Sequence, residues 1–566
     1  MCQIRANHSN SIQVPKRMSR VQVVKLVAGL LIALVMLMAW NTTRVFWQQT
    51  EVVHFDYIVG QRSIDDKDAK VETPAGSCPE SGCEVPKKPH IVFVLADDYG
   101  YHDVGYHGSR IKTPNLDRLA AEGVKLERYY VQPMCSPSRT QLMSGRYQIH
   151  TGLVHNIIHP MQANALPLDS PTIGDLMKNA GYSTHYTGKW HLGFYKKAFL
   201  PTHRGFDSFL GFLTGSIDYY NHKNCNMQHK ACGLDLYKDD ELLQDKDGVY
   251  GPDMYTARAL EVIRNHDPTK PLLLFVSHQL VHTPLQVPER YVKPYNYIKD
   301  KSRRLYAGMT ACLDDHVGIL EKALKEKGLW DNTVFIFSSD NGGEVNQGAS
   351  NWPLRGSKGS HHEGGIRAIG FVTGPLVARK GTVNNQMIHI SDWLPTLAHL
   401  AGITPNASLA AKLDGYNQWE TISYGTSSPR TEFLINIDIL MPLMGERLYP
   451  DLFDTRVRAG IRFGDYKLIT GDIGKNNDYY MPAEMTNSGQ QEVKLGNSKG
   501  RNYRLFNIID DPLEQYDLAD THPQLVRFLL KRLDQWNNES VPVQNPTWEE
   551  QSRPGPQNGW VWRPWK

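Results

Sequence analysis

The sequence predicts an α/β fold in which helices flank a large, mostly parallel β-sheet. Two short apolar runs, Ile91–Ala96 and Thr333–Phe337, are typical of strands buried on both faces of such a sheet. Polar and charged residues follow directly after these runs, at the strand ends where open α/β sheets bind their ligands. Toward the C-terminus the strands become shorter and alternating, and Arg456–Phe463 with Tyr466–Thr470 reads as a hairpin. A helix over Gln524–Trp536 is expected to follow it.

The composition fits an ordinary globular protein. With 566 residues the chain is long enough for more than one domain and a large core. Hydrophobic residues make up 40% of the chain and charged residues 21%, both usual values. The net charge of +3 is nearly balanced, which argues against a nucleic-acid-binding protein because that class carries a basic face or stripe. We expect no nucleic-acid partner.

The N-terminal segment predicts entry into the secretory pathway. Residues 1–20 are polar and basic, and Leu26–Trp40 holds only apolar residues and glycine. The segment over residues 21–40 is either a cleaved signal peptide or a signal anchor. We favour a single-pass membrane anchor with residues 1–20 in the cytosol, because the apolar run is not followed by a convincing cleavage site. The bulk of the chain is then lumenal or extracellular, with the lysosome as the alternative location.

A stem or linker is expected over residues 41–88, which are mostly polar and lack periodicity. Sequons for N-glycosylation begin at Asn41, Asn406 and Asn538 on the predicted lumenal side.

Seven cysteines are few for this length. In an oxidising compartment, two pairs lie close enough in the sequence for local disulfides, Cys78 with Cys83 and Cys225 with Cys232. Cys312 falls in a helical-looking run and is expected to be a buried free thiol.

Acidic and amide side chains follow the two buried runs. Asp97 and Asp98 come directly after the first run, and Asp340 and Asn341 follow the second after two serines. Three carboxylates and an amide oxygen make an all-oxygen site, which suits a hard cation such as Ca²⁺ or Mg²⁺. The sequence has no Cys/His cluster of zinc spacing, which argues against zinc.

Basic side chains follow two further predicted strands. Lys189 and His191 come after one, and His282 comes after the other, while Lys358 lies in a glycine-containing loop. Taken singly, each has a simpler explanation as a core histidine or a solvated lysine. Together they would surround a metal and a nucleophile with positive charge, which suits an anionic substrate group.

The segment Cys135-Ser136-Pro137-Ser138-Arg139 predicts a helix N-terminus. Ser136 is a good N-cap and Pro137 suits the first helical position. Cys135 would then lie where free N–H groups and the helix dipole attract an anion, with Arg139 on roughly the same face. By itself this cysteine reads either as a structural or disulfide cysteine or as an activated thiolate nucleophile.

Taken with the other motifs, the chain resembles the type I sulfatases, most closely the arylsulfatase B (N-acetylgalactosamine-4-sulfatase) group. The resemblance runs from about His90 to the region of Leu518. It implies an alkaline-phosphatase-like catalytic domain over residues 89–430, a C-terminal subdomain with an antiparallel sheet and a helix over 431–540, and a tail over 541–566. The segments that carry it, in order, are Asp97-Asp98, Cys135–Arg139, Gly188-Lys189-Trp190-His191, Val281-His282-Thr283-Pro284, Asp340-Asn341-Gly342-Gly343 and the Lys358 loop.

The resemblance also implies a role for each candidate residue. The metal is Ca²⁺, and its ligands match Asp97, Asp98, Asp340, Asn341 and the modified Cys135. Cys135 is converted to formylglycine by the formylglycine-generating enzyme, and the aldehyde hydrate supplies the attacking oxygen. Arg139 and Lys189 hold the hydrate and neutralise charge, and His191 acts as a base when sulfate is released. His282 and Lys358 bind sulfate oxygens and help to protonate the leaving alcohol.

The function expected from this resemblance is hydrolysis of sulfate esters, on sulfated N-acetylgalactosamine of glycosaminoglycans. Two alternatives remain open: a metal-dependent phosphatase or phosphodiesterase of the same superfamily, and a membrane-anchored glycan-binding protein without activity. A phosphatase would more naturally use serine or threonine as its nucleophile and more histidine as metal ligand.

Overall fold

The computed structural model describes residues 88–226, 229–472, 474, 477–486, 491–493 and 501–566. The predicted cytosolic segment, the anchor or signal peptide, residues 41–87 of the stem, the Asn41 sequon and the Cys78/Cys83 pair lie outside the described residues. Within the described part of the chain, no helix is both long and apolar enough to cross a membrane.

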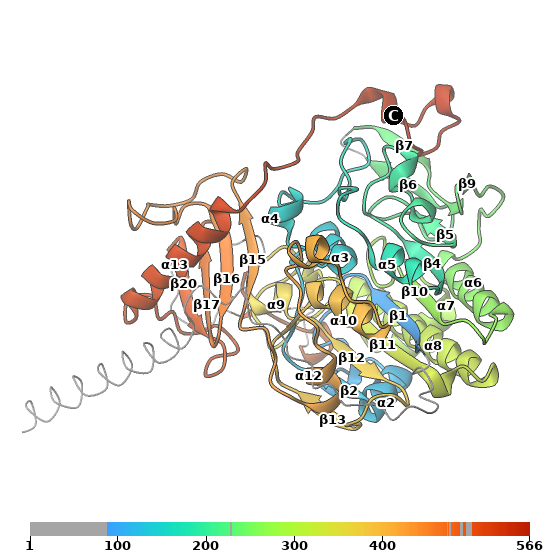
Figure 1. Ribbon diagram of the computed structural model, residues 1–566, viewed down its shortest axis with the longest axis horizontal. Helices are drawn as coiled ribbons and strands as arrows, with labels where there is room; N and C mark the ends of the chain where they lie inside the picture. The colour runs from blue at the N-terminus through green and yellow to red at the C-terminus, as the bar shows by residue number, and fades with distance from the viewer. Residues whose placement is uncertain (1–87, 227–228, 473, 475–476, 487–490, 494–500) are drawn as a thin grey trace, which may run out of the picture. The chain divides into compact units, whose positions relative to one another are not determined.

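A ten-stranded mixed sheet forms the centre of the fold (Figure 1). The strand order is β13-β2-β12-β11-β1-β10-β4-β5-β8-β9, and the five strands from β11 to β5 are mutually parallel. This confirms the predicted fold class. The strands are β1 (His90–Ala96), β2 (Val124–Leu126), β4 (Ser183–Lys189), β5 (Ser208–Phe212), β8 (Tyr237–Lys238), β9 (Glu241–Leu242), β10 (Leu272–Ser277), β11 (Thr333–Ser339), β12 (Gly370–Thr373) and β13 (Thr382–Asn384).

Helices cover both faces of this sheet. They are α2 (Pro114–Glu122), α3 (Cys135–Ser144), α5 (Ile173–Asn179), α6 (Gly251–Asn265), α8 (Lys301–Glu326) and α10 (Trp393–Leu400). Val92 and Val94 of β1 pack in one hydrophobic cluster with residues of α2, α6 and α8. The alternating residues Ile91 and Phe93 pack in a second cluster with residues of α3, α5 and α10. A strand that is buried on both faces has to be apolar throughout, which explains the unbroken run in the sequence.

Strand register brings the carboxyl ends of the parallel strands to one edge of the sheet. Ala96 of β1 pairs with Ser339 of β11, and Leu95 pairs with Ser277 of β10. Ser277 in turn pairs with Gly188 of β4. The residues that follow these positions in the sequence are therefore neighbours in space.

The C-terminal part of the catalytic chain contains a second, antiparallel sheet. Its order is β15-β16-β17-β20, and helix α13 (Pro523–Asn538) contacts β16. The strands are β15 (Glu432–Asp438), β16 (Arg458–Phe463), β17 (Tyr466–Thr470) and β20 (Tyr503–Asn507). The predicted hairpin and the predicted C-terminal helix are both confirmed, whereas the domain boundaries at residues 430 and 540 stay predictions.

Short elements complete the fold, and one of them carries a disulfide. Cys225 and Cys232 face each other across the antiparallel pair of β6 (Lys223–Asn226) and β7 (Ala231–Leu234) and form the predicted bond. Cys312, in α8, is a buried free thiol as predicted. The remaining short elements are β3 (Tyr129–Tyr130) with β14 (Ile388–His389), β6 (Lys223–Asn226) with β7 (Ala231–Leu234), β18 (Tyr479–Met481) with β19 (Gln491–Val493), α4 (Gln148–Thr151), α7 (Glu289–Val292), α9 (Glu363–Ile366), α11 (Ala407–Ala410) and α12 (Trp419–Tyr424).

The last residues pack back onto the large sheet domain. The red segment after α13 in Figure 1 runs to the β6–β7 hairpin. Trp548 forms a β-bridge with Gln162, and Val561 forms one with Leu234. Trp562 is fully buried in the cluster that contains α3 and α10. Trp562 therefore belongs to the core and Trp548 and Trp565 pack against it, whereas Trp560 is exposed; the sequence did not indicate this.

A buried ion network joins the C-terminal sheet to the catalytic part. The Nζ atom of Lys467, on β17, lies 2.9 Å from a carboxylate oxygen of Glu363 and 2.7 Å from one of Glu514. All three side chains are fully buried. Burial alone would raise the pKa of Glu514, but Lys467 and His362 outweigh it and hold the pKa well below its usual value.

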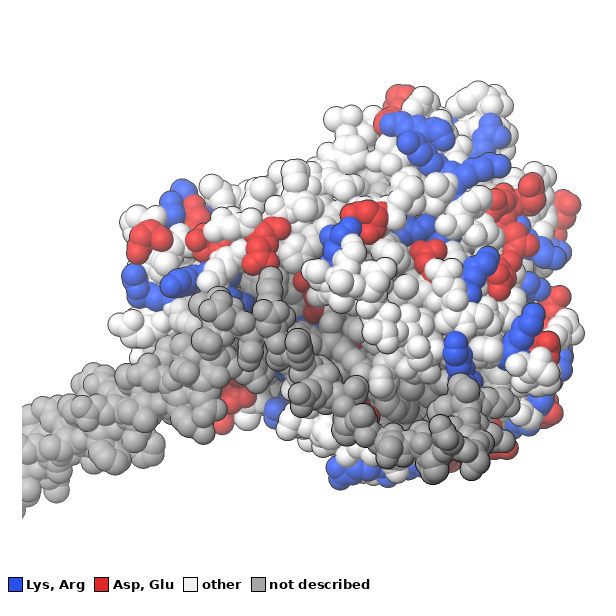
Figure 2. All heavy atoms as spheres, in the orientation of Figure 1, with Lys and Arg blue, Asp and Glu red and all other residues white. Residues whose placement is uncertain are grey.

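We predict that Lys467→Met lowers the free energy of unfolding by about 3–5 kcal/mol, because it leaves two buried carboxylates without their partner. Chemical denaturation measures the change. A matched control is Lys322→Met, which removes an exposed pair with Glu326. Figure 2 shows basic and acidic residues scattered over the visible face of the molecule. The effect of Lys322→Met should stay within about 0.5 kcal/mol. Equal effects of the two substitutions would contradict the role of the network.

Candidate active site

Of the five predicted metal ligands, the three aspartates and the asparagine lie together at the carboxyl edge of the large sheet. Asp97 and Asp98 follow β1, and Asp340 and Asn341 follow β11. The backbone N–H of Asp98 donates to Asp340 Oδ1 at 3.2 Å, and Asn341 Nδ2 donates to Asp98 Oδ1 at 2.7 Å. All four side chains are almost completely buried. Asp98 has a positive φ of 59°, which turns the chain sharply after the strand.

Each of the three carboxylates is paired with one cation. The pairs are Lys189 Nζ with Asp97 Oδ2 at 2.6 Å, Lys358 Nζ with Asp98 Oδ2 at 2.8 Å, and Arg139 Nε with Asp340 Oδ2 at 2.9 Å. Lys189 is fully buried and Arg139 nearly so. Charge-assisted hydrogen bonds of this length are the strong kind, and burial removes the water that would weaken them.

Arg139 connects four strand ends, and its hydrogen bond to Asp340 after β11 is the first of these contacts. Its Nη1 donates to the carbonyl oxygen of Lys189 at 3.2 Å and to Ser277 Oγ at 2.7 Å. Its Nη2 lies 3.6 Å from Asp97 Oδ1. The planar guanidinium therefore fixes the relative positions of β1, β4, β10 and β11 at the site.

Cys135 is the first residue of α3 and is 2% exposed. The thiol lies within the field of the cluster: burial raises its pKa, and Lys189 and Lys358 oppose that rise. The predicted cap is wrong, because Met134 occupies the N-cap without a side-chain hydrogen bond and Pro137 is the third helical residue. Proline is tolerated there because N–H groups of the first turn have no intrahelical acceptor.

Ser136 has a tertiary role instead of the predicted capping role. Its Oγ accepts a hydrogen bond from the N–H of Ile158 at 3.0 Å and lies 3.0 Å from His191 Nε2. The same Nε2 lies 3.1 Å from the carbonyl oxygen of Ile158. Because a carbonyl can only accept, Nε2 carries the proton and Nδ1, which has no partner, is bare. Burial, with Lys189 and Arg139 nearby, lowers the pKa of His191 well below its usual value.

His282 is also held as a neutral imidazole. Its Nδ1 donates to the carbonyl oxygen of Thr283 at 2.6 Å, which leaves Nε2 unprotonated, 3.6 Å from Asp98 Oδ2. Burial and the charge of Lys358 lower the pKa of His282 to about 3. Ligand atoms of Asp97, Asp98 and His282 lie within 4.8 Å of one another.

The donor set fits a hard divalent cation. Asp97 Oδ1 and Asn341 Oδ1 are buried and have no hydrogen-bond partner, which is costly unless a cation satisfies them. Burial and the neighbouring Asp97 carboxylate raise the pKa of Asp340 to about 6, although Arg139 opposes them. The cluster therefore has room for more positive charge than its own side chains supply, and its oxygens are the ligands that Ca²⁺ prefers.

All the predicted site residues are brought to this one place. Sequence reasoning missed Glu344, whose carboxylate lies 4.0 Å from Lys358 Nζ, and Tyr306, whose hydroxyl donates to the carbonyl oxygen of Asp98. Glu344 directly follows the Asp340–Gly343 motif, so its position was a usable signal. Tyr306 lies on α8, and no feature of the sequence around it indicated its role at the site.

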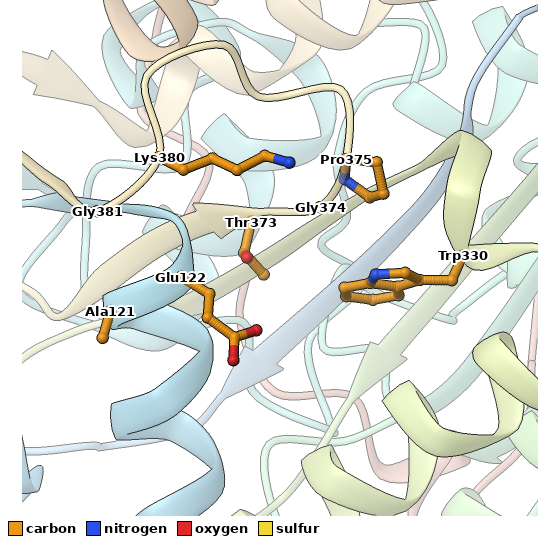
Figure 3. A pocket seen from close by; sticks show the side chains of 8 residues that line it. All are labelled: Ala121, Glu122, Trp330, Thr373, Gly374, Pro375, Lys380 and Gly381. Carbon is orange, nitrogen blue, oxygen red and sulfur yellow. The ribbon is translucent and has the colours of Figure 1, made fainter.

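A separate pocket of 460 Å³ lies away from these residues (Figure 3). Trp330 precedes β11 and Gly374 follows β12, which is antiparallel to β11. The pocket is therefore at the opposite edge of the sheet from Asp340. Its lining residues are Ala121, Glu122, Trp330, Thr373, Gly374, Pro375, Lys380 and Gly381.

The fold is of the α/β class, and its buried cluster of oxygen ligands and cations fits a hard cation beside an anionic group. The family model described as Sulfatase matches residues 89–403. Arylsulfatase J of Mus musculus is 49% identical over 494 residues, which cover 86% of this chain and 82% of that protein. N-acetylgalactosamine-6-sulfatase of Homo sapiens is 31% identical over 373 residues, which cover 63% and 70%.

A solved structure is similar to this chain in fold over most of both chains. The crystal structure of Ps i-CgsB in complex with k-i-k-neocarrahexaose has a TM-score of 0.66 and 28% identity, and covers 82% of this chain and 96% of that one. The chain belongs to the sulfatase family, and the relatives support sulfuric ester hydrolysis as its activity. The finer resemblance to the arylsulfatase B group stays a prediction.

We predict that removing divalent ions with EGTA lowers the melting temperature and that Ca²⁺ restores it, because an ion that binds only the folded state stabilises it by about 3 kcal/mol at a hundredfold excess over Kd. Asn341→Ala should shrink this response. The control Asn384→Ala changes another buried asparagine, on β13, and should keep it. An undiminished response in Asn341→Ala would count against the proposed ligand set.

Proposed function

We propose that the chain hydrolyses sulfate esters on sulfated N-acetylgalactosamine of glycosaminoglycans, with a formylglycine derived from Cys135 and a bound Ca²⁺. One observation carries this proposal. Around Cys135, three buried carboxylates are each paired with a cation, and two buried oxygens, on Asp97 and Asn341, have no hydrogen-bond partner.

The charge of the site supports an anionic substrate. The three carboxylates and three cations cancel, so a divalent ion would leave the site with net positive charge. When bound, Ca²⁺ would be held by Asp97, Asp98, Asp340, Asn341 and residue 135, and would polarise a sulfate oxygen as a Lewis acid. The hydrated aldehyde of formylglycine supplies a nucleophilic oxygen that a thiol lacks.

Side chains of this chain provide the remaining chemistry. Lys189 and Lys358 place ammonium groups beside the carboxylates, where they attract sulfate oxygens and neutralise the charge that develops on them. Arg139 fixes residue 135 relative to the strand ends. The bare Nδ1 of His191 is placed to accept a proton, and the neutral His282 is available at Nε2.

The substrate class rests on the relatives. One is named N-acetylgalactosamine-6-sulfatase, and one solved structure holds k-i-k-neocarrahexaose. We extend the sulfated carbohydrate class from these proteins to this chain. The proposal also requires the formylglycine-generating enzyme during biosynthesis, and therefore passage through the secretory pathway with the anchor or signal peptide expected over residues 21–40.

A phosphatase or phosphodiesterase is the second candidate, and one observation favours it. The unprotonated Nε2 of His282 belongs to the group of close ligand atoms with Asp97 and Asp98, and histidine ligands are more usual in such enzymes than in sulfatases. Initial rates with an aryl sulfate and the matching aryl phosphate separate the two. Preference for the phosphate by the modified protein would overturn the sulfatase proposal.

Mass spectrometry tests the nucleophile directly. Trypsin cuts after Arg128 and Arg139, so Cys135 falls in the peptide Tyr129–Arg139. In protein made in secretory cells with the modifying enzyme, we expect this peptide with the mass of an aldehyde in place of the thiol side chain. Finding only unmodified cysteine in such protein would remove the proposed mechanism.

Lys358→Ala should lower kcat for an aryl sulfate by about 10²–10³, the usual cost of losing one group that stabilises developing charge. Lys380→Ala is the matched control, because Lys380 is exposed and lines the pocket at the other edge of the sheet. Its kcat should equal that of the parent. A Lys358 variant with unchanged kcat would contradict the assigned role.

A further inference from the structure

A second group of metal-type ligands lies on the opposite face of the large sheet from Cys135. Asp253 belongs to α6, and Cys312 and His316 lie one turn apart on α8. One ligand atom from each lies within 4.8 Å of the other two. His316 Nε2 is 3.0 Å from Asp253 Oδ1 and 3.8 Å from Cys312 Sγ.

These distances suit a tetrahedral ion. Zn²⁺ binds sulfur at about 2.3 Å and nitrogen or oxygen at about 2.0–2.2 Å, so neighbouring ligand atoms in a tetrahedron lie roughly 3.3–3.7 Å apart. The observed separations of 3.0 Å (His316 Nε2 to Asp253 Oδ1) and 3.8 Å (His316 Nε2 to Cys312 Sγ) lie just below and just above that range. The mixed thiolate, imidazole and carboxylate set favours a borderline transition-metal ion over the hard Ca²⁺ of the catalytic cluster.

An independent feature is the unsatisfied histidine beside this group. His278 is fully buried, and neither of its ring nitrogens has a hydrogen-bond partner. Its ring stacks on that of His316 with 5.4 Å between centroids. Burial lowers the pKa of His278 well below its usual value, so the ring is neutral, which is the form that binds metals. Two unpaired buried nitrogens are costly unless a ligand satisfies one of them.

Binding of an ion would replace two contacts, the hydrogen bond between Cys312 and Tyr291 and the one between His316 Nε2 and Asp253 Oδ1. Arg290 Nη2 lies 3.7 Å from Asp253 Oδ2, the oxygen that does not face His316. The Asp253 side chain is 43% exposed, which gives an ion a route from solvent to the otherwise buried Cys312 and His316.

We propose that Asp253, Cys312 and His316 form a second metal site that binds Zn²⁺, with His278 alongside to supply the fourth donor directly or through a water. The ion cross-links α6 to α8. It also stabilises His278, which directly follows Ser277. The Oγ atom of Ser277 accepts a hydrogen bond from Arg139. Binding displaces the proton of Cys312, because the thiolate is the ligand form.

Cobalt substitution tests the site without any turnover measurement. Elemental analysis of the full secreted chain should give one Zn²⁺ per molecule. After exchange with Co²⁺ alone, a thiolate-to-cobalt charge-transfer band and intense visible bands of tetrahedral Co²⁺ should appear. Cys312→Ser should abolish the charge-transfer band. Asp253→Asn changes a half-exposed side chain, which protects against a folding failure, and should weaken Co²⁺ binding at least tenfold.

Two controls make the result specific. Asp315→Asn alters an exposed carboxylate next to the site on α8. Cys135→Ala removes the thiol of any Cys135 left unmodified, the other described cysteine outside a disulfide. Both should keep the bands. The proposal is overturned if the parent binds no Zn²⁺, if it binds Co²⁺ without a thiolate band, or if the band persists in Cys312→Ser.

Discussion

The active site depends on the pairing of buried carboxylates with buried cations at the carboxyl edge of the sheet. An isolated charge at this depth would cost several kcal/mol. The three buried aspartates therefore require nearby cations to offset the cost of burying their charge. The buried Lys189 and Arg139 require the carboxylates for the same reason. Since two oxygens still lack a hydrogen-bond partner, the same pairing that makes the cluster stable also leaves it ready for a divalent ion. The pairing of buried carboxylates with cations therefore determines both the stability of the cluster and its affinity for a metal ion.

The rest of the fold positions these charges. In-register parallel strands bring Asp97, Lys189 and Asp340 to one edge, and the flanking helices bury that edge on both faces. The C-terminal sheet supports the loop that carries Lys358. Arg355, three residues earlier, donates to the carbonyl oxygen of Glu514, which itself pairs with Lys467 of the second sheet. The smaller sheet is therefore part of the machinery that holds a catalytic cation in place.

Local patterns in the sequence were enough to predict the strands, because burial on both faces demands an unbroken apolar run. They also predicted the groups at the strand ends, because parallel register brings those ends to one edge of the sheet. Local patterns failed to predict the role of a side chain where a contact with a distant residue determines it. Ser136 looked like a cap, but Ile158 and His191 use its hydroxyl. The Lys467 network joins residues far apart in the chain and left no local signal. In the zinc-type group, Cys312 and His316 lie four residues apart in the sequence, but Asp253 comes from a different helix, so the sequence alone did not reveal the group.

A high-resolution crystal structure of the protein made in secretory cells, grown with Ca²⁺, is the most direct test of this account. It predicts one ion with oxygens of Asp97, Asp98, Asp340 and Asn341 at about 2.3–2.6 Å, next to a formylglycine at position 135. A cation bound elsewhere, with Asp97 Oδ1 and Asn341 Oδ1 still unpaired beside an unmodified cysteine, would contradict it.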